Sequence, residues 1–500
     1  MRSNPHTLNE AFALSVSSHP GRTFVIHGGD SLTYEESYRA SCSLASYLGQ
    51  MGVGRADRVG MLLPRVPELV ISMLGMSLAG IIPVPVNYTL SAEEVEGFFT
   101  SSGATAAIVH SKFLAHMSEG LKASLSGRMI VVGEAVDGLI PWAEAASARA
   151  SGFIPYQAAL DDTAYLNYTT GTGGAPKGAI ATHSNMYWNT RSSVEAMEIT
   201  SEDRHLCMFA SFAHPHEIFA RPLYTGGSIV LLEEINPKTI ARTIKDHAVT
   251  VMMGLAPMYD MMATHLKGQG IDTLRVAESG GMYTNPALNA RFMEAFGRPI
   301  LSVWGSTETS GIALANRPSD FRTDGSAGKP CPHYEVRVVD DEGADVPDGE
   351  AGEFAFRGEG VISGYYGNGS FNSHDGWYMS GDIGYRDPEG FFHFLDRRNG
   401  MLKVAGLKVY PLQVELALQH HPGIAEVAVI GHEDRLRGVV PKAIIVPRDG
   451  AQIDEAELRS FCKGRLADYM VPRKVVLVDA LPKIGSGKIN KKALMKEHAE

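Results

Sequence analysis

The chain of 500 residues is too long for one hydrophobic core of ordinary size, so the sequence predicts at least two folding units. An apolar fraction of 44% and a charged fraction of 20% are typical of a globular protein in water. The net charge of −11 argues against general nucleic-acid binding, which requires an excess of Lys and Arg, so any anionic ligand needs a local cationic site.

Neither a membrane span nor an export signal is expected. The most apolar run, residues 66–86, is interrupted by Glu68 and by two glycines, and it ends in prolines. No apolar signal-peptide core follows the first residues. The four cysteines lie far apart, which fits reduced thiols better than a disulfide frame or a zinc site. We therefore expect a cytoplasmic protein.

Strand-like and helix-like segments alternate along the first part of the chain, and again from about residue 225 to residue 301. This β-α-β order predicts largely parallel sheets that are covered by helices. The expected strands are 23–27, 58–63, 81–86, 228–232 and 249–253, and the expected helices are 34–51, 66–79, 236–247 and 257–266.

Short β-runs with frequent Gly, Asp and Pro follow from about residue 326 to residue 394, and a compact mixture of strands and helices ends the chain. The predicted fold class is α/β. We expect a large N-terminal domain, residues 1–396, with helix-covered parallel sheets and a β-rich module. A small α+β domain is expected at residues 397–500.

A loop dense in Gly and Thr carries the strongest local signal. Residues 168–178 read Tyr-Thr-Thr-Gly-Thr-Gly-Gly-Ala-Pro-Lys-Gly, after a β-like run and before a helix-like run from Ser184. Inward N–H groups, hydroxyls and a lysine suit a polyphosphate. Pro176 excludes a Walker A loop, and a plain surface turn is the alternative. The predicted contacts are Thr169, Thr170, Gly171, Thr172, Gly173, Gly174 and Lys177.

This loop resembles the phosphate loop of the acyl-adenylate-forming superfamily, which includes acyl- and aryl-CoA synthetases, adenylation domains of peptide synthetases and firefly luciferase. The N-terminal region is similar only in texture. Further motifs follow in the order of the family: Trp304-Gly-Ser-Thr-Glu308, Met379-Ser-Gly-Asp382, Asp396-Arg397, Leu402-Lys-Val-Ala-Gly406, Tyr410-Pro-Leu-Gln-Val-Glu415 and Pro482-Lys-Ile-Gly-Ser-Gly-Lys488.

The resemblance implies that ATP activates a small carboxylic acid as an acyl adenylate, with release of pyrophosphate, and that coenzyme A then receives the acyl group. The acid and the α-phosphate repel each other, so the site must place cations and donors beforehand. By resemblance, Glu308 and Thr169 would hold Mg²⁺ and Thr307 would donate to the α-phosphate. Lys488 would bridge the two anions.

Other positions take their expected roles from the same resemblance. Trp304 would lie against the adenine, with Gly305, Ser306, Gly281 and Met282 beside the adenylate. Asp382 and Arg397 would bind the ribose. Taken singly, each of these residues would more often be an ordinary surface or core residue, and only their order along the chain favours the functional reading.

The resemblance also implies that the C-terminal domain, residues 397–500, is mobile and rotates between the two half-reactions. The pivot of the family is normally Asp or Lys, whereas Asn399 stands at that place here. After rotation, Lys403 and Gly406 would line the tunnel for the thiol.

The acyl pocket is expected to include Phe212, His214 and His216, together with Gly280 and Gly305. Gly305 would leave room for a long or aromatic acid. Arg221 could clamp a second carboxylate, although an arginine on a helix surface is the commoner arrangement.

Alternatives remain at this point. The chain could load a carrier protein instead of coenzyme A, or bind a nucleotide without catalysis, or act as a luciferase-like oxygenase. The acid itself and a homodimer are left open by the sequence.

Overall fold

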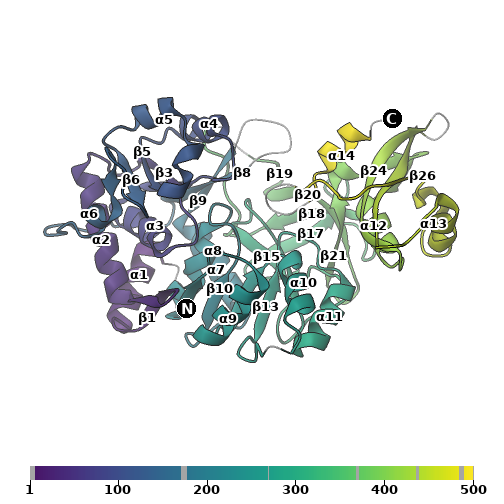
Figure 1. Cartoon of the computed structure of the whole chain (residues 1–500), viewed down its shortest axis with the longest axis horizontal. Helices are drawn as coiled ribbons and strands as arrows, with labels where there is room; N and C mark the ends of the chain where they lie inside the picture. Colours follow the sequence, from purple (N-terminus) through teal and green to yellow (C-terminus); the bar gives the residue numbers. More distant parts are fainter. Residues whose placement is uncertain are drawn as a thin grey trace. The chain divides into compact units, whose positions relative to one another are not determined.

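The computed structural model describes residues 6–169, 177–268, 270–367, 371–434, 438–483 and 489–498. They form two compact units (Figure 1): unit 1 is residues 1–336 with 356–378, and unit 2 is residues 337–355 with 379–500. The sequence instead placed a boundary after residue 396. That boundary concerned the part that rotates, and it stays a prediction.

A mostly parallel sheet runs through unit 1 in the order β16-β15-β14-β13-β12-β10-β11-β1-β2. Strand β1 pairs with β11, and this pairing places Val25 opposite Ile229. Strands β2, β15 and β16 run antiparallel to their neighbours. The strands are β1 (Thr23–His27), β2 (Asp30–Thr33), β10 (Arg204–Cys207), β11 (Ser228–Leu231), β12 (Val251–Gly254), β13 (Val276–Ser279), β14 (Leu301–Ser306), β15 (Gly311–Ala315) and β16 (Lys329–Pro330).

Helices cover both faces of this sheet. On one face, Ile244, Tyr259 and Phe292 are buried with apolar residues of the strands. Side chains alternate along a strand, so His205 and Cys207 of β10 face the other side, toward α8. The first group of helices is α9 (Pro237–His247), α10 (Ala256–His265) and α11 (Pro286–Phe296), and the other helices are α1 (Leu8–Ser18), α2 (Tyr34–Gln50), α3 (Pro67–Ala79), α7 (His183–Ala196) and α8 (Pro215–Thr225).

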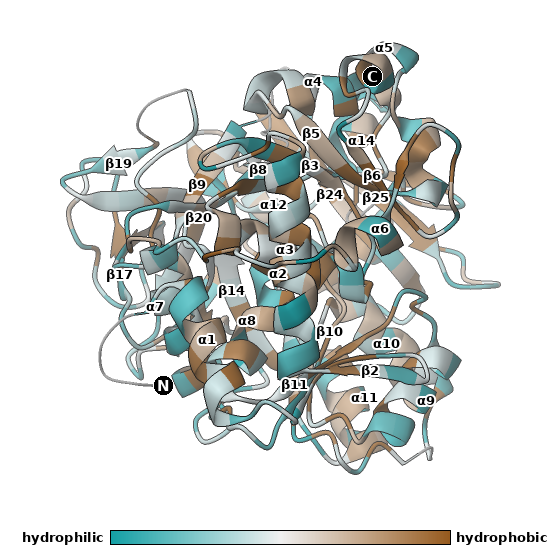
Figure 2. Cartoon of the chain, turned by 90° about the vertical axis from the view of Figure 1, so that its left-hand side faces the viewer, coloured by the Kyte–Doolittle hydropathy of each residue, from teal (hydrophilic) through white to brown (hydrophobic). Residues whose placement is uncertain are grey.

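A second sheet of unit 1 is parallel throughout, in the order β4-β3-β5-β6-β7, as the alternation of elements predicted. Figure 2 shows its strands as largely apolar around β3, β5 and β6, which agrees with their burial. Its elements are β3 (Arg58–Leu62), β4 (Ile82–Pro85), β5 (Ala106–His110), β6 (Met129–Val132), β7 (Ile140–Pro141), α4 (Ala92–Ser102), η1 (Ser111–His116), α5 (Glu119–Ser124) and α6 (Trp142–Ala146).

Two strands, β8 (Thr163–Thr169) and β9 (Lys177–Thr182), form an antiparallel pair ahead of α7. A further sheet has the order β17-β18-β20-β19, with β21 paired to β20, and the division between the units lies within three of its strands. Its strands are β17 (Glu335–Val339), β18 (Gly352–Arg357), β19 (Ser373–His374), β20 (Trp377–Arg386) and β21 (Phe392–Arg397).

The sheet of unit 2 has the order β23-β22-β25-β24, with β26 beside β25. One apolar core lies between this sheet and α12 with α13, and another lies beneath α14. The elements are η2 (Arg398–Gly400), β22 (Leu402–Val404), β23 (Leu407–Val409), α12 (Pro411–Gln419), β24 (Ile424–Asp434), β25 (Gly438–Pro447), α13 (Glu455–Cys462), η3 (Asp468–Met470), β26 (Lys474–Leu477) and α14 (Lys491–Glu497). Among the residues described, no helix combines the length and the apolar character that crossing a bilayer requires.

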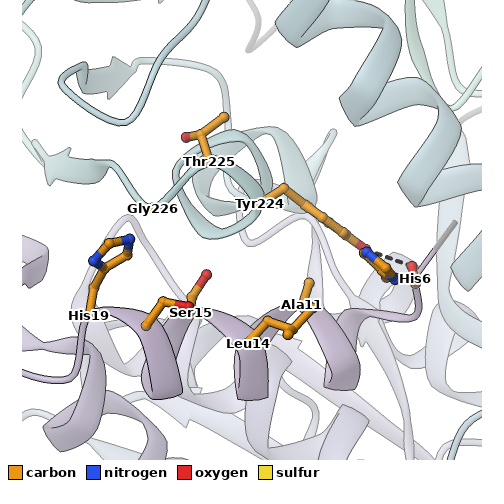
Figure 3. A pocket seen from close by; sticks show the side chains of 9 residues that line it. His6, Ala11, Leu14, Ser15, His19, Tyr224, Thr225 and Gly226 are labelled. Atoms are coloured by element: carbon orange, nitrogen blue, oxygen red, sulfur yellow. Dashed lines mark hydrogen bonds between the residues drawn. The ribbon is translucent and has the colours of Figure 1, made fainter. Parts of the chain in front are cut away.

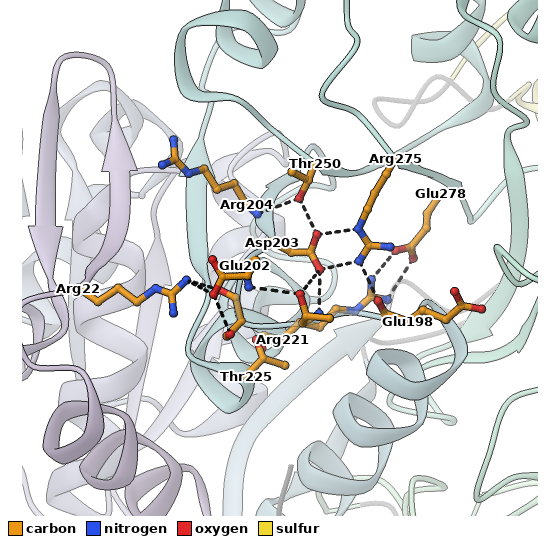
Figure 4. A network of polar contacts seen from close by, with 12 residues as sticks. Arg22, Glu198, Glu202, Asp203, Arg204, Arg221, Thr225, Thr250, Arg275 and Glu278 are labelled. Atoms are coloured by element: carbon orange, nitrogen blue, oxygen red, sulfur yellow. Dashed lines mark hydrogen bonds and ion pairs between the residues drawn. The ribbon is translucent and has the colours of Figure 1, made fainter.

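Asp203 anchors a polar cluster just before β10 (Figure 4). Its side chain is 3% exposed, and it accepts hydrogen bonds from the Thr200 N–H, from Thr250 Oγ1 at 2.7 Å and from Arg275 Nε at 2.8 Å. Burial on its own would raise the pKa of Asp203, but the hydrogen bonds and the guanidinium charge outweigh it and lower the pKa to about 2. The carboxylate therefore stabilises the folded state.

We expect Asp203→Asn to lower the free energy of unfolding by about 2 kcal/mol at neutral pH, from the difference between the folded and unfolded pKa values. Because the folded pKa is the lower one, this stabilisation is present above about pH 4 and is lost as the pH falls toward 2. Urea unfolding of both proteins at a series of pH values measures it. Asp260→Asn, which removes an exposed partner of Arg291, is the control. A difference that stays constant into the acid range would contradict the assignment.

Candidate active site

The turn between β14 and β15 carries Thr307 and Glu308 at the carboxyl end of a strand in the main sheet of unit 1. Such ends are where α/β sheets place their ligands. Side-chain hydrogen bonds close the turn in both directions: Ser306 N–H donates to Thr309 Oγ1 at 2.9 Å, and Thr309 N–H donates to Ser306 Oγ at 3.2 Å. These hydrogen bonds therefore hold the turn in one conformation.

Glu308 is held by a residue that the sequence did not indicate. The Tyr365 hydroxyl donates to Glu308 Oε1, and the Glu308 carbonyl oxygen accepts from the Ile362 N–H at 2.9 Å. Burial and the Glu308 carboxylate raise the pKa of Tyr365 well above its usual value, so the hydroxyl keeps its proton. Lys177 Nζ lies 5.3 Å from the centre of the Tyr365 ring, which brings the predicted phosphate lysine toward Glu308.

The predicted phosphate loop lies between β8 and β9, two antiparallel strands, and α7 follows β9 from His183, close to the helix-like run expected from Ser184. The sequence did not indicate strand β9, because its Gly and Ala residues are weak β-formers. Thr169 ends β8. The other predicted contacts of this loop, Thr170, Gly171, Thr172, Gly173 and Gly174, lie outside the described residues.

Trp304 lies in β14, and its ring stacks on that of Phe356, with centroids 4.2 Å apart and planes 2° apart. One face of the indole thus contacts the protein itself. Its contact with adenine stays a prediction, as does the place of Ser306 beside the adenylate.

Strand pairing gives a reason for the glycine at position 305 that the sequence did not indicate. A Cβ at this position would lie 2.3 Å from the carbonyl oxygen of Gly311 and 2.9 Å from Ile312 Cα, because β14 and β15 approach closely where their register shifts. The missing side chain therefore serves strand pairing. That Gly305 also leaves room in the acyl pocket stays a prediction.

Gly280 follows β13, and a Cβ there would lie 2.9 Å from Val303 Cγ2 and 3.4 Å from Phe209 Cζ. Gly281 adopts φ +71, which favours glycine, and Met282 follows it. This glycine pair adjoins apolar and aromatic side chains, as a wall of an acyl pocket requires. The contacts of these residues with a ligand stay predictions.

Phe212 lies shortly before α8, and His214 immediately precedes its first residue. The Phe212 ring meets Tyr88 edge-on at 5.2 Å, and His214 is the N-cap residue of the helix. His216 differs, because it is 1% exposed and accepts a hydrogen bond from the Tyr165 hydroxyl at 2.7 Å. Burial lowers the pKa of His216 to about 3, so the ring is neutral. The place of His216 in the acyl pocket stays a prediction.

Arg221 fits neither of the two interpretations considered from the sequence. It is 2% exposed, and its guanidinium donates to both carboxylate oxygens of Glu278, at 2.5 and 3.1 Å, and to Ser193 Oγ at 3.1 Å (Figure 4). The pair joins α8 to β13 inside unit 1. Arg221 is thus neither a surface residue nor available for a second carboxylate of the substrate.

In unit 2, Asp382 and Arg397 lie directly opposite each other on β20 and β21, and Arg397 Nε is 2.6 Å from Asp382 Oδ1. The Asp382 side chain is 2% exposed, whereas that of Arg397 is 60% exposed. The structure therefore brings together the two residues that the resemblance assigned to the ribose, although their motifs lie in separate strands.

The predicted pivot lies in η2, which contains Asn399. Just before it, Asp396 accepts hydrogen bonds from its neighbour Arg397 N–H at 2.7 Å and from Leu412 N–H at 3.0 Å. Lys403 is exposed on β22, and Gly406 adopts φ +86 with open space around it. Their roles at a thiol tunnel stay predictions. Lys488 lies outside the described residues.

A cavity of about 260 Å³ lies elsewhere in unit 1, where α1 and α8 end (Figure 3). It is lined by polar groups that include His19 and Thr225, and the Tyr224 hydroxyl donates to the His6 carbonyl oxygen at its edge. None of the predicted site residues lines this cavity, so we do not assign the chemistry to it.

Two family models together match most of this chain. The family model described as AMP-binding enzyme matches residues 12–366, and the one described as AMP-binding enzyme C-terminal domain matches residues 413–488. A feruloyl-CoA synthase from Amycolatopsis is 34% identical over 482 residues, which cover 94% of this chain and 95% of that protein.

Two further CoA ligases are similar to this chain over nearly its full length. A long-chain-fatty-acid–CoA ligase from Salmonella typhimurium is 28% identical over 544 aligned residues, covering 98% of this chain and 94% of the relative. The crystal structure of the anthranilate CoA ligase AuaEII, in complex with anthranoyl-AMP, superposes with a TM-score of 0.90 at 28% identity and covers 99% of this chain and 97% of that one.

Proposed function

We propose an aromatic carboxylic acid as the substrate of this chain, which belongs to the AMP-binding enzyme family. The chain is an AMP-forming acid–CoA ligase: it activates a carboxylic acid with ATP as an acyl adenylate and forms the coenzyme A thioester. The observation that carries the aromatic assignment is the 34% identity, over nearly the full length of both chains, to a feruloyl-CoA synthase.

Features around the predicted acyl pocket favour an aromatic acid with a single carboxylate. Phe209 and Val303 lie against Gly280 and offer apolar surface for a ring. Arg221, the cation considered for a second carboxylate, is already neutralised by Glu278. A dicarboxylic acid would therefore lack this counter-charge and would lose more on leaving water.

We propose that Glu308 binds Mg²⁺ together with oxygens of the nucleotide. Mg²⁺ takes oxygen ligands and commonly combines one or two carboxylates with substrate phosphates and water, so the residues present fit it. Thr169, which the resemblance also assigns to the ion, ATP and water would supply the remaining ligands. When bound, the ion would offset the negative charge of the phosphates. Tyr365 would orient the carboxylate, and Thr307 would donate to the α-phosphate.

In unit 2, the buried Asp382 carboxylate is suited to accept hydrogen bonds from ribose hydroxyls, with Arg397 holding its orientation. Lys488 would bridge the acid and the α-phosphate in the first half-reaction, and rotation of residues 397–500 would replace it by the Lys403 segment in the second. A homodimer and a cytoplasmic location stay predictions from the sequence.

A screen of pyrophosphate release tests the proposal. Purified protein with Mg²⁺ and ATP would be offered ferulate, benzoate, anthranilate, a long-chain fatty acid and a dicarboxylate of similar size. We expect the highest kcat/KM with one of the aromatic acids and thioester formation when coenzyme A is added. Preference for the fatty acid or the dicarboxylate would contradict the aromatic assignment. A phosphopantetheine carrier protein, supplied beside coenzyme A, tests the alternative acceptor.

A further inference from the structure

The backbone that follows Glu308 takes an unusual course. Ser310 adopts φ 55° and Gly311 adopts φ 133°. Residues other than glycine rarely adopt such positive φ angles. Such a conformation persists only where the surroundings enforce it. The side chains that enforce it are therefore of interest, because Thr307 and Glu308 belong to the same turn.

One of these side chains is Asn189 of α7, which is 1% exposed. Its Nδ2 donates to the carbonyl oxygens of Thr309, at 3.3 Å, and of Ile312, at 3.1 Å. The Tyr334 hydroxyl also donates to the Thr309 carbonyl, at 2.6 Å. Asn189 thus spans the turn and fixes its two ends at once.

The other is Glu217 of α8, which accepts a hydrogen bond from the Ile312 N–H. A Cβ at Gly311 would lie 2.5 Å from Glu217 Oε1 and 2.7 Å from Asn189 Oδ1, so these two side chains occupy the space that a side chain at Gly311 would need. His216, beside Glu217, donates to the Ser310 carbonyl. Two helices therefore converge on residues 309–312.

The charges around Glu217 suit an acceptor rather than a chemical participant. Burial raises the pKa of Glu217 to about 7, Arg221 lowers it and Glu278 raises it. Glu217 is only 6% exposed. Either protonation state keeps an oxygen that can accept from the Ile312 N–H, so the contact does not depend on ionisation.

We propose that Asn189 and Glu217 are positioning residues, which hold the turn at residues 309–312 and thereby place Thr307 and Glu308 for formation of the acyl adenylate. The inference rests on the roles proposed above for Thr307 and Glu308. Neither Asn189 nor Glu217 touches substrate in this account. They act through the backbone of the turn, by hydrogen bonds to the carbonyl oxygens of Thr309 and Ile312 and to the Ile312 N–H.

Two properties separate positioning from ordinary packing. If the side chains only add stability, their loss lowers the melting temperature and leaves the folded enzyme unchanged. If they position the turn, their loss also lowers kcat for pyrophosphate release, leaves KM for the acid nearly unchanged and spares thioester formation from a supplied acyl adenylate. The second pattern follows because Glu308 is proposed to bind Mg²⁺ together with the phosphates of ATP, and the triphosphate is consumed in the first half-reaction.

The experiment compares Asn189→Ala, Glu217→Ala and Glu217→Gln with the wild type. Gln keeps the size and the acceptor of Glu217, so it should restore activity. The matched control is Asn289→Ala, because Asn289 is 2% exposed on α11 and likewise bonds to backbone, through the carbonyl and the N–H of Ile300. All variants are assayed well below their melting temperatures.

We expect kcat for pyrophosphate release to fall about 10- to 100-fold in both alanine variants of the turn, and to stay within about threefold in Glu217→Gln and Asn289→Ala. Hydrogen exchange of peptides covering residues 301–315 should accelerate in the two turn variants and not in the control. The exchange readout holds even if the wild type acts on no acid in the panel, so it separates failure of this inference from failure of the proposed function. Unchanged exchange and unchanged kcat in folded Asn189→Ala and Glu217→Ala would overturn the inference.

Discussion

Replacing Lys488 by alanine is expected to slow formation of the acyl adenylate by about 10²–10³-fold and to slow thioester formation from a supplied acyl adenylate much less. Two unit charges about 4 Å apart interact by roughly 4 kcal/mol at an effective dielectric near 20, which is the scale of what the lysine offsets between acid and phosphate. The asymmetry follows if rotation has removed the lysine before the thiol attacks.

Separate assays of the two half-reactions measure this effect: pyrophosphate release with acid and ATP, and thioester formation with synthetic acyl adenylate and coenzyme A. Lys483→Ala is a matched control, because Lys483 belongs to the same motif and pairs with Glu426 at 2.8 Å on the surface of unit 2. It should leave both rates nearly unchanged. Equal losses in the two half-reactions of Lys488→Ala would refute a lysine that moves.

The second large effect is expected for Glu308→Gln, which should lower kcat for pyrophosphate release by about 10²-fold and raise the Mg²⁺ concentration needed for half-maximal rate. Glutamine keeps an oxygen to accept from Tyr365, so the geometry of the turn is retained while the charge is lost. The effect then reports on the metal and the phosphates rather than on folding.

Initial rates over a Mg²⁺ titration at saturating ATP give both quantities. The control is Glu335→Gln, which removes an exposed partner of Arg357 and should change neither. A normal Mg²⁺ dependence in Glu308→Gln would show that this carboxylate does not hold the ion. Loss of activity together with a large fall in melting temperature would point instead to a structural role.

Local patterns predicted several of the helices and strands of this chain. The apolar spacing of residues 34–51 gives α2, and the short apolar run at 58–63 gives β3, because burial of one face dominates such segments. Strand β9 was missed, since its Gly and Ala residues give little β-propensity and only its pairing with β8 makes it a strand. A local sequence pattern does not indicate which distant segments pair.

The same limit applies to the site. Motif order was enough to indicate Asp382 and Arg397, and these residues do face each other. Tyr365 was missed because its role depends on one hydrogen bond to Glu308. The two residues are more than fifty positions apart, and no sequence pattern indicates such a contact. The expectation for Arg221 failed for a related reason: its buried counter-ion, Glu278, is a property of packing, which a residue type alone does not reveal.

The pairing of β1 with β11 has a consequence for how the protein is made. During synthesis, the strand at residues 23–27 leaves the ribosome long before residues 228–231 exist, and until then one of its edges has no native partner. The emerging chain must keep an apolar edge from associating with other chains while about two hundred residues are added. We expect newly made protein to depend on chaperones during this interval, and fragments ending before β11 to aggregate.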